Sequence, residues 1–446
     1  MEWISLLGII AAIALFAALC FKGIPVTVSA PVLSIMLWLF SAAAGDGLSF
    51  DGAVRIFSSG AASAIERYLL LFMFSASFGG LLCEVGIASA IGAFFSGLIM
   101  RAPKRWQKLL AVAVVPLINA ILTYSGVSLF VVVFAVVAIA RDLFRRMDVP
   151  WHLYSMSMIG SATFTSGLLP GSPSLSNLVP MEYLGTTSLA APVLSLILSA
   201  VSLALGAGYM AFALWRTERA GEGFLPTGEG ISQVEFRTQA GERKICVPLA
   251  FLPMLSPVIF INAAGLSVEL SLLLSNLLIL ILYRKHLNLE RVKNGLVSGL
   301  TAGISPAISL GVMMGFGSML TSSSGFRPIL RLVYGVPGPM VLKAIVMVSV
   351  TSFLLGNANA GITTSLEAMG PDALLLSGVS PEVLHRAVSM ASLFGASPHS
   401  SALCNSLLVA KLNHRVSYRH YFVIGIVNTA ILSAVAVVLI QAGITY

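Results

Sequence analysis

The sequence predicts an all-α polytopic membrane protein with about 11–12 transmembrane segments in two inverted repeats, each containing a re-entrant hairpin and a broken helix. Three observations support this fold class. Of the 446 residues, 57% are hydrophobic and 10% are charged, whereas soluble proteins carry about 25% charged residues. Apolar runs close to the length that spans a bilayer recur along the chain. Sequence patterns from the first half return in the second half.

The N-terminal part, residues 1–67, is predicted to hold two spans and an outer loop. Residues 3–21 and 24–44 are apolar runs. We expect the first to be a retained helix, because no basic segment precedes it and another span follows at once. Residues 45–67 contain three acidic side chains and are expected to form the outer loop.

The first inverted repeat is predicted to cover residues 68–215. It opens with an apolar segment of 33 residues, 68–100. This exceeds the roughly 20 residues that one span needs, so Gly79, Gly80 and Gly86 are candidate breaks.

Two shorter apolar stretches, residues 109–122 and 127–140, are expected to be the arms of a re-entrant hairpin. The next outward passage contains the hydroxyl-rich residues 161–177, and residues 190–214 lead back. This part of the chain therefore combines a hairpin with an interrupted span.

A polar linker, residues 216–244, separates the first repeat from the second, which is predicted to cover residues 245–446. The linker contains five Lys/Arg, five Glu and five Gly. It is too short and too poor in apolar residues to form a core of its own.

The net charge of +8 reflects membrane topology. The basic residues cluster between apolar runs, at 101–108, 141–146, 284–293 and 411–419. This is the positive-inside pattern, which places these loops in the cytoplasm and the N-terminus outside. Nucleic acid is therefore not expected as a partner. The expected location is the inner membrane, in multi-pass form.

The four cysteines, Cys20, Cys83, Cys246 and Cys404, show no CxxC spacing, and each lies in or beside an apolar stretch. We expect no metal site, no disulfide and no cofactor.

Internal repetition is the most informative feature. SFGGLL (77–82) matches GFGSML (315–320), and TYSGVSLF (123–130) corresponds to ANAGITTS (358–365). Farther on, residues 148–167 correspond to 378–397, and PGSPSLSNLV (170–179) parallels ASPHSSALCNSLLV (396–409). We count an odd number of membrane crossings between the SFGGLL and GFGSML motifs. An odd number makes the repeats inverted, as in secondary transporters.

Four polar stretches interrupt the apolar segments, two in each repeat: TYSGVS (123–128), SGLLPGSPSLSN (166–177), GNANAGITTS (356–365) and FGASPHSS (394–401). Irregular backbone at membrane depth is tolerated only where protein buries it or where it lines an aqueous cavity. Broken-helix ends offer N–H groups to anions and carbonyls to cations. The alternative is that these small residues only mediate close helix packing. Because the stretches are placed symmetrically, we favour a binding site.

The candidate ligands of this site are hydroxyls, amides and glycines of the four stretches. They are Ser125, Gly126, Ser128, Gly171, Ser172, Ser174, Asn177, Asn357, Asn359, Gly361, Thr363, Ser397 and Ser400.

Ionisable residues inside the apolar segments are few. His399 is the best candidate to carry a proton, because its unperturbed pKa lies near neutrality, and the alternative is a structural imidazole bonded to backbone. Arg386 is either a carboxylate clamp or, as we favour, an interfacial arginine whose head group reaches the headgroup region. Glu84 and Glu182 are expected at helix ends or interfaces.

The chain resembles the gluconate permease (GntP) family of the ion transporter superfamily. The resemblance is carried by residues 123–150, 161–187, NANAGITTSLEAMGP (357–371) and 380–402. It implies proton-coupled uptake of gluconate or a related small carboxylate by a homodimer with an elevator mechanism. It also places the hairpin tips near Ser125–Ser128 and Asn359–Thr363, and the broken-helix loops near Pro170–Asn177 and Gly395–Ser401.

Two departures from the family pattern leave the substrate open. The chain has TSGLLPG (165–171) where the family has a threonine-rich run, and SPHSS (397–401) where the family has LPHNG. Sodium-coupled transport of citrate or dicarboxylates is the alternative, because cages of hydroxyls and carbonyls also suit Na⁺. The chain has no HExxH or GxSxG motif to support an enzyme. Broken helices in inverted repeats fit alternating access better than a channel.

Overall fold

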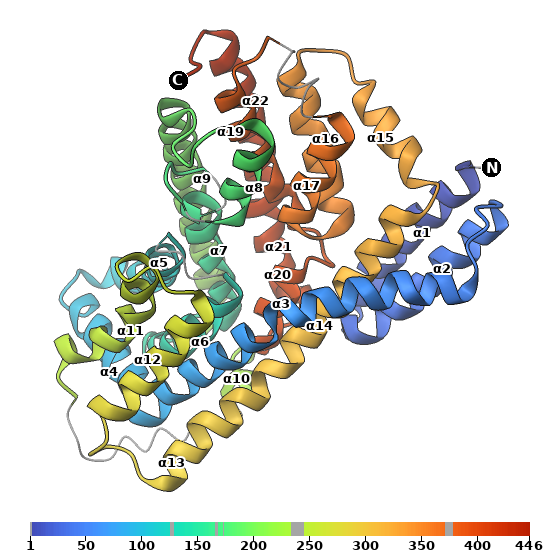
Figure 1. Cartoon of the computed structure of the whole chain (residues 1–446). Coiled ribbons are helices and arrows are strands. Elements are labelled where there is room, and N and C mark those ends of the chain that lie inside the picture. The colour runs from blue at the N-terminus through green and yellow to red at the C-terminus, as the bar shows by residue number, and fades with distance from the viewer. Residues whose placement is uncertain (1, 125–128, 166–167, 173, 233–244, 371–377) are drawn as a thin grey trace.

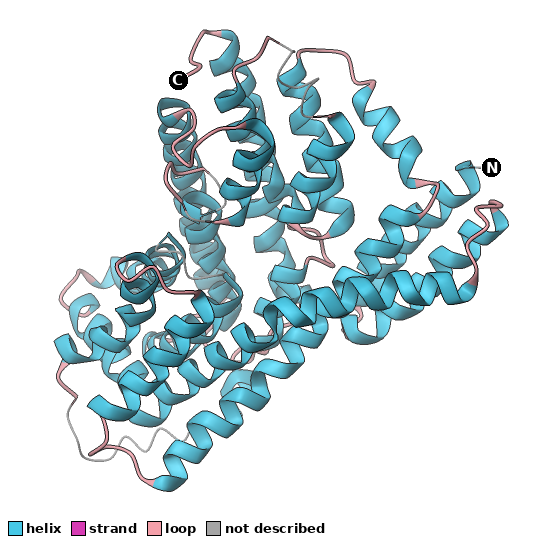
Figure 2. Ribbon diagram, viewed as in Figure 1, coloured by secondary structure: helices cyan, strands magenta, loops and turns pink. Residues whose placement is uncertain are grey.

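The computed structural model describes residues 2–124, 129–165, 168–172, 174–232, 245–370 and 378–446. Within these ranges the regular elements are all helices, and no strand occurs (Figure 2). Seven of the described helices are long and apolar enough to cross a membrane, and several shorter apolar helices accompany them. The predicted fold class, an all-α polytopic membrane protein, is confirmed.

The first two helices lie close to the predicted spans, but the third is longer than the sequence suggested. Helices α1 (Glu2–Phe21) and α2 (Val26–Ala43) pack against each other, and α3 follows as a single helix of 36 residues, Phe50–Val85. The Ser49 hydroxyl accepts a hydrogen bond from Gly52 N at 3.1 Å and caps α3. The predicted outer loop of residues 45–67 is therefore wrong, because an N-cap lets the helix begin at residue 50.

The break in the long apolar segment comes at Gly86. Its φ of +89° ends α3, and α4 (Ile87–Ile99) begins directly afterwards. A left-handed φ of this kind favours glycine. Gly79 and Gly80, also predicted as breaks, lie inside α3.

The first hairpin consists of α5 (Lys104–Tyr124) and α6 (Leu129–Met147), which pack together. Both are longer than the predicted arms. The connecting residues 125–128 lie outside the described residues.

The first broken helix follows the hairpin. Its first part is a continuous run of short helical turns, η1 (Trp151–Met156), α7 (Ser157–Gly160) and η2 (Ser161–Thr165), and its second part is α8 (Leu175–Leu184). Between them the described residues 168–172 and 174 are non-helical. The predicted interruption is confirmed for these residues. Helix α9 (Pro192–Arg219) completes this half of the chain.

The second half contains the same order of elements. Helices α11 (Val247–Asn262) and α12 (Val268–Leu282) precede a long continuous helical run, α13 (Leu289–Lys293), η3 (Asn294–Ser298) and α14 (Gly299–Ser322). Then come α15 (Phe326–Tyr334), the hairpin α16 (Met340–Leu355) and α17 (Ala358–Met369), the broken helix α19 (Pro381–Ala391), η4 (Ser392–Gly395) and α20 (Ser401–Ala410), and the terminal run α21 (His414–Tyr421), η5 (Phe422–Val427) and α22 (Asn428–Gln441). The inverted orientation of the halves stays a prediction.

The long helices α3 and α14 run side by side through the molecule (Figure 1). Their close approach depends on glycine. A Cβ added to Gly299 would lie 2.4 Å from Ser77 Cα, and one added to Gly303 would lie 2.5 Å from Phe72 O. Small residues let membrane helices approach until their backbones touch. Glycines of the repeated FG motifs also lie on this packing surface, because a Cβ added to Gly80 would lie 2.8 Å from Gly295 O and one added to Gly315 would lie 2.7 Å from Phe57 O.

The linker between the halves packs partly on the body of the protein. Phe224 is buried, and its backbone N–H donates to Asp148 Oδ1 at 2.9 Å. The short helix α10 (Glu229–Ser232) buries Ile231. Residues 233–244 lie outside the described residues.

Candidate functional site

Each hairpin ends against the loop of the broken helix in its own half of the chain. Tyr124, the last residue of α5, donates from its hydroxyl to Pro170 O at 2.8 Å. In the second half, Ser401 N donates to Gly356 O at 3.0 Å, at the point where α16 ends. The hydroxyl of Ser401 also lies 3.5 Å from Asn357 Nδ2. Each hairpin therefore contacts the interruption in its own half of the chain, the first through a side chain and the second through backbone groups.

The tip of the second hairpin is at Gly356–Asn357. Gly356 has φ +59° and ends α16, and the Asn357 side chain accepts from Ala360 N at 3.1 Å, which starts α17. The predicted tip at Asn359–Thr363 is therefore wrong by a few residues. An asparagine N-cap satisfies the first free N–H groups, so the helix begins earlier than the polar composition suggested.

The second hairpin also reaches the first broken helix. Ser176 in α8 donates from its hydroxyl to Asn359 Oδ1 at 3.1 Å, and Ser389 in α19 donates to Ser176 O at 2.8 Å. Helices α8, α17 and α19 thus converge, although Ser176 and Ser389 are 213 residues apart in the sequence. We did not predict Ser176 or Ser389 as ligands, although both lie in hydroxyl-rich segments.

Four side chains form the centre of this convergence: the buried Asn177, His385 and Arg386 and the half-buried Thr186, which we call the Asn177 cluster. Asn177 Oδ1 lies 2.9 Å from His385 Nε2 and accepts from Arg386 Nη1 at 3.2 Å. Because a carbonyl oxygen only accepts, His385 Nε2 carries a hydrogen. His385 Nδ1 then accepts from the Thr186 hydroxyl at 2.6 Å.

The amide nitrogen of Asn177 closes the first broken-helix loop. It donates to Ser172 O at 2.8 Å and to Ser188 O at 3.1 Å. Gly171 N donates to the same Ser188 carbonyl at 2.9 Å, and Gly171 has φ +79°. Of the predicted residues, Gly171, Ser172, Asn177 and Asn359 are therefore brought together.

Arg386 is fully buried, at 0% exposure. It donates to Ala190 O from Nη2 at 2.8 Å and from Nε at 3.3 Å. The favoured interpretation of Arg386 as an interfacial arginine is therefore wrong, because α19 directs the guanidinium into the protein between the two broken helices. A buried ionisable group inside a membrane protein is a candidate functional residue.

His399 lies in an aromatic pocket formed by Phe16, Phe316 and Phe353. Its ring is nearly parallel to that of Phe16, with centroids 5.1 Å apart, and the other two rings lie at steep angles 6.4 Å away. Its Nε2 lies 3.0 Å from Leu354 O and donates to that carbonyl. His399 also borders an apolar cavity of about 380 Å³ beside α1. It thus joins the second broken-helix loop to α1 and α14.

The remaining predicted ligands differ in their surroundings. Gly361 serves packing, since an added Cβ would lie 2.0 Å from Ser352 Oγ. The hydroxyls of Ser174 and Ser397 are buried and have no hydrogen-bond partner among the described residues. Thr363 is half-buried in α17, and Ser400 is buried just before α20. Ser125, Gly126 and Ser128 lie outside the described residues.

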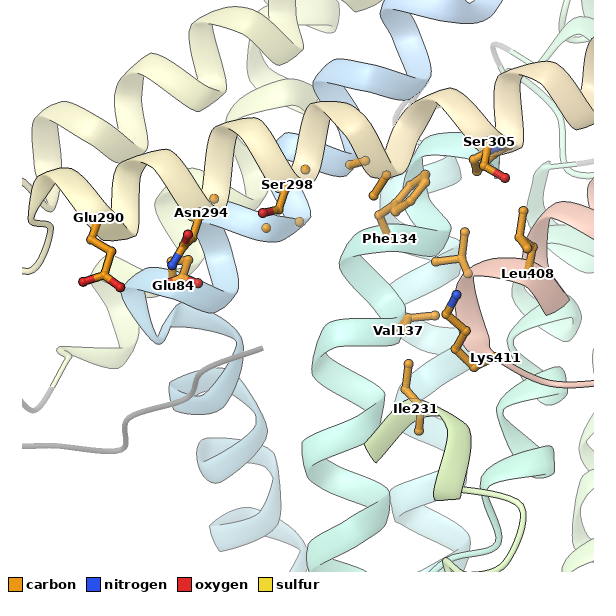
Figure 3. A pocket seen from close by; sticks show the side chains of 18 residues that line it. Glu84, Phe134, Val137, Ile231, Glu290, Asn294, Ser298, Ser305, Leu408 and Lys411 are labelled. Carbon is orange, nitrogen blue, oxygen red and sulfur yellow. The ribbon is translucent and has the colours of Figure 1, made fainter. Parts of the chain in front are cut away.

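The larger cavity, about 690 Å³, lies elsewhere, between the α3–α14 pair and helices α6 and α20 (Figure 3). Glu84, Glu290 and Lys411 are its charged lining residues. None of the predicted ligands in the described part of the chain borders it. Glu84 lies in the last turn of α3, as predicted for a helix end.

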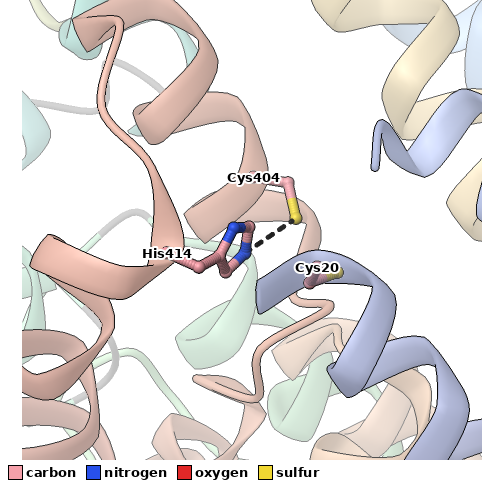
Figure 4. A group of neighbouring side chains, drawn as sticks. All are labelled: Cys20, Cys404 and His414. Carbon is pink, nitrogen blue, oxygen red and sulfur yellow. Dashed lines mark hydrogen bonds between the residues drawn. The ribbon is translucent and has the colours of Figure 1, made fainter. Parts of the chain in front are cut away.

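Cys20, Cys404 and His414 lie together, with their ligand atoms within 4.8 Å of one another (Figure 4). His414 Nε2 is 2.8 Å from Pro398 O and 4.0 Å from Cys404 Sγ. The imidazole therefore holds the second broken-helix loop in place. The sequence did not reveal this cluster, because its members come from α1, α20 and α21.

The fold and this site define a multi-pass α-helical membrane protein in which two hairpins and two broken helices converge. The chain is 28% identical over 485 residues to the uncharacterised transporter YxjC of Bacillus subtilis, across 99% of this chain and 100% of that protein. No family model matches the chain.

Two solved structures share weaker similarity. MtrF of Neisseria gonorrhoeae, described among antimetabolite efflux pumps, has 14% identity and a TM-score of 0.40, covering 87% of this chain and 84% of that one. The YdaH transporter of Alcanivorax borkumensis has 12% identity and a TM-score of 0.37, covering 89% and 90%. Both TM-scores are too low for these similarities to bear on this chain.

Proposed function

We propose that this protein is a secondary active transporter that imports a small organic anion, such as gluconate or a related hydroxy carboxylate, by proton symport. The similarity over the whole chain to an uncharacterised transporter supports the general class. The buried Arg386 within the Asn177 cluster supports the anionic substrate.

Arginine suits this role because its planar guanidinium can bind a carboxylate with two parallel hydrogen bonds. Arg386 comes from α19 and contacts Asn177 of α8. A carboxylate bound here would touch both broken helices at once. Movement of the two halves around a substrate at their interface is the basis of alternating access. An elevator motion in a homodimer of the inner membrane is the form that the family resemblance suggests.

Two observations bear on the coupling ion. The buried hydroxyls of Ser174 and Ser397 have no hydrogen-bond partner in the described structure, although buried polar groups are nearly always bonded. Hydroxyls are suitable ligands for a substrate oxygen or for Na⁺. They therefore also favour the alternative, a sodium-coupled transporter of citrate or dicarboxylates. For proton coupling, His399 is one candidate and the His152–His420 pair described below is another.

The test uses the purified protein in proteoliposomes with labelled gluconate, lactate or citrate outside. Inward proton and sodium gradients are imposed separately. Accumulation of gluconate or lactate with the proton gradient alone supports the proposal. Accumulation that requires sodium, or a preference for citrate, supports the alternative. Absence of both accumulation and exchange for all three anions contradicts the proposed substrate class.

The matched variants are Arg386→Lys and Arg331→Lys. Arg331 lies on α15 with a side chain 65% exposed, so it serves as the control. Lysine keeps the charge but not the forked geometry. Losing one of two hydrogen bonds to a carboxylate costs about 1.5–3 kcal/mol. We expect Arg386→Lys to raise the half-saturating concentration at least about tenfold. Equal behaviour of the two variants at equal melting temperature contradicts a carboxylate clamp at Arg386.

A further inference from the structure

Two buried histidines from distant parts of the chain are hydrogen-bonded to each other. His152 lies in η1, at the start of the first broken helix, and His420 lies in α21. Each is 1% exposed, and His152 Nδ1 is 3.0 Å from His420 Nε2. The rings are within 3° of parallel, with centroids 5.2 Å apart. The nitrogen–nitrogen distance of 3.0 Å is shorter than the separation of about 3.5 Å between two rings in face-to-face contact. The two rings therefore meet edge to edge.

Each end of the pair continues into another hydrogen bond. His152 Nε2 is 2.9 Å from Glu222 Oε2, and His420 Nδ1 is 3.0 Å from the Tyr209 hydroxyl. All four ring nitrogens are therefore used. The Glu222 side chain is 41% exposed, whereas Tyr209 is half-buried on α9. The four residues form one line of hydrogen bonds from the exposed Glu222 through the two buried imidazoles to the half-buried Tyr209, which we call the histidine relay.

The relay has two arrangements of donors and acceptors. The hydrogen bond that Arg419 Nε donates to His420 Nε2 at 3.3 Å belongs to the arrangement after a proton transfer, in which His420 Nε2 is an acceptor. The arrangement before a transfer lacks that bond. The Tyr209 hydroxyl donates to His420 Nδ1, His420 Nε2–H donates to His152 Nδ1, and His152 Nε2–H donates to the Glu222 carboxylate. A proton that arrives at His420 Nδ1 displaces the Nε2 proton of that ring onto His152 Nδ1. The Nε2 proton of His152 then passes to Glu222 and leaves to water. One proton enters and one leaves, and both imidazoles are left with the hydrogen on Nδ1, so the rings must turn over before the next transfer.

The surrounding charges favour release over storage. Arg419 and Arg216 face His420, and Arg419 Nε lies 3.3 Å from His420 Nε2. Their positive charges disfavour the protonated, positively charged form of the His420 ring. Burial lowers the pKa of His152 below its ordinary value, although the hydrogen bond to Glu222 acts in the other direction. A proton on these rings therefore resides briefly and moves toward the carboxylate.

The position of the relay links it to the proposed transport site. His152 begins the same continuous run of turns that leads to the Ser172 loop, and His420 follows α20 in the other half. Basic clusters at 141–146 and 411–419 place this end of the molecule on the expected cytoplasmic side. A shift of the first broken helix relative to α21 would break the bond between the two imidazoles.

We propose that the histidine relay is the route by which the coupling proton leaves to the cytoplasm during transport. This inference rests on the proposed function, because it assumes proton symport. It assigns the proton step to His152 and His420, which the sequence analysis did not single out.

The experiment separates coupling from transport itself. Wild-type protein and His420→Gln, His152→Gln and His286→Gln variants are reconstituted in proteoliposomes with labelled gluconate. His286 lies in the loop between α12 and α13 and serves as the control. Two rates are measured for each variant: accumulation driven by an inward proton gradient, and exchange of gluconate at equal concentration and pH on both sides.

We expect both relay variants to lose gradient-driven accumulation at least about tenfold, while exchange stays within about twofold of wild type. Exchange needs no net proton release, so it bypasses the relay. The His286→Gln control should retain both activities. Because a buried histidine variant can fail to fold, Glu222→Gln at the exposed end is measured as well and should slow accumulation in the same direction.

Three results would overturn the relay. The first is full accumulation in the His420→Gln and His152→Gln variants. The second is loss of accumulation in His399→Gln while the relay variants keep it, which would assign the proton to His399. The third is accumulation in wild type driven by sodium alone, which leaves the transport function standing. Absence of both exchange and accumulation in wild type would instead contradict the proposed substrate.

Discussion

Replacing Asn177 by aspartate tests the anion site most directly. Asn177 Oδ1 already accepts from Arg386 Nη1 at 3.2 Å, so Asn177→Asp places a carboxylate against the guanidinium without a change of shape. The new carboxylate would neutralise the Arg386 guanidinium, which we assign to binding of the substrate carboxylate. The variant therefore competes with the substrate from within the protein.

The magnitude follows from the hydrogen bonds. A hydrogen bond to a charged group contributes about 1.5–3 kcal/mol, and each buried carbonyl left without a donor costs about 1–3 kcal/mol. Aspartate gains the first at Arg386 and loses the second at Ser172 O, whereas Ser188 O keeps the hydrogen bond from Gly171 N. The two terms nearly offset, so we expect a melting temperature close to that of wild type. Neutralising Arg386 should weaken carboxylate binding by about 2–5 kcal/mol, or roughly 30- to 4,000-fold.

The assay is stabilisation of the purified protein by gluconate and citrate, measured as the shift in melting temperature with concentration. Asn276→Asp is the matched control. Asn276 is a buried asparagine on α12 that donates to Phe74 O at 3.0 Å. It should lose stability without a change in anion affinity. An Asn177→Asp variant that binds and exchanges either anion as wild type does would refute the role of Arg386.

Three further predictions concern packing and pH. Gly361→Val should lower the free energy of unfolding by about 1–3 kcal/mol, measured by thermal melting, because its Cβ would overlap Ser352; an unchanged melting temperature would contradict the close contact between α16 and α17. Burial lowers the pKa of His152, so below about pH 6.5 the unfolded chain binds a proton more readily than the folded chain. The free energy of unfolding should therefore decrease as the pH falls below this value, and His152→Gln should reduce that decrease. Burial acts to raise the pKa of Asp46, but hydrogen bonds led by that from Ser324 lower it overall. The stability that Asp46 contributes should therefore be lost as pH falls through its lowered pKa, and Asp46→Asn should melt at a temperature that depends less on acid.

Composition and periodicity determined the fold class of this protein. Scarcity of charge and recurring apolar runs require helices, because a helix satisfies its own backbone hydrogen bonds in lipid. The proline and glycine residues of 166–177 and 394–401 predicted the two broken helices, and the structure has non-helical backbone within both ranges, at 168–172 and 174 and at 396–400. These are local properties, which the sequence expresses directly.

Helix boundaries were harder to predict. The acidic residues of 45–67 suggested a loop, but the Ser49 cap and the glycine-rich face of α14 let α3 run through most of it. Polar composition likewise placed the predicted tip of the second hairpin inside α17, whereas the structure has this tip at Gly356. In both cases a single capping residue outweighed average composition.

Only the tertiary structure decided which polar groups meet. Arg386 faces Asn177 at a sequence separation of 209, and His420 faces His152 at a separation of 268. Neither pair has a spacing or motif that a linear pattern can reveal. Burial of a charged or polar side chain is stable only when distant partners supply its hydrogen bonds. Those partners are fixed by how the helices pack, so they become visible only in the folded chain.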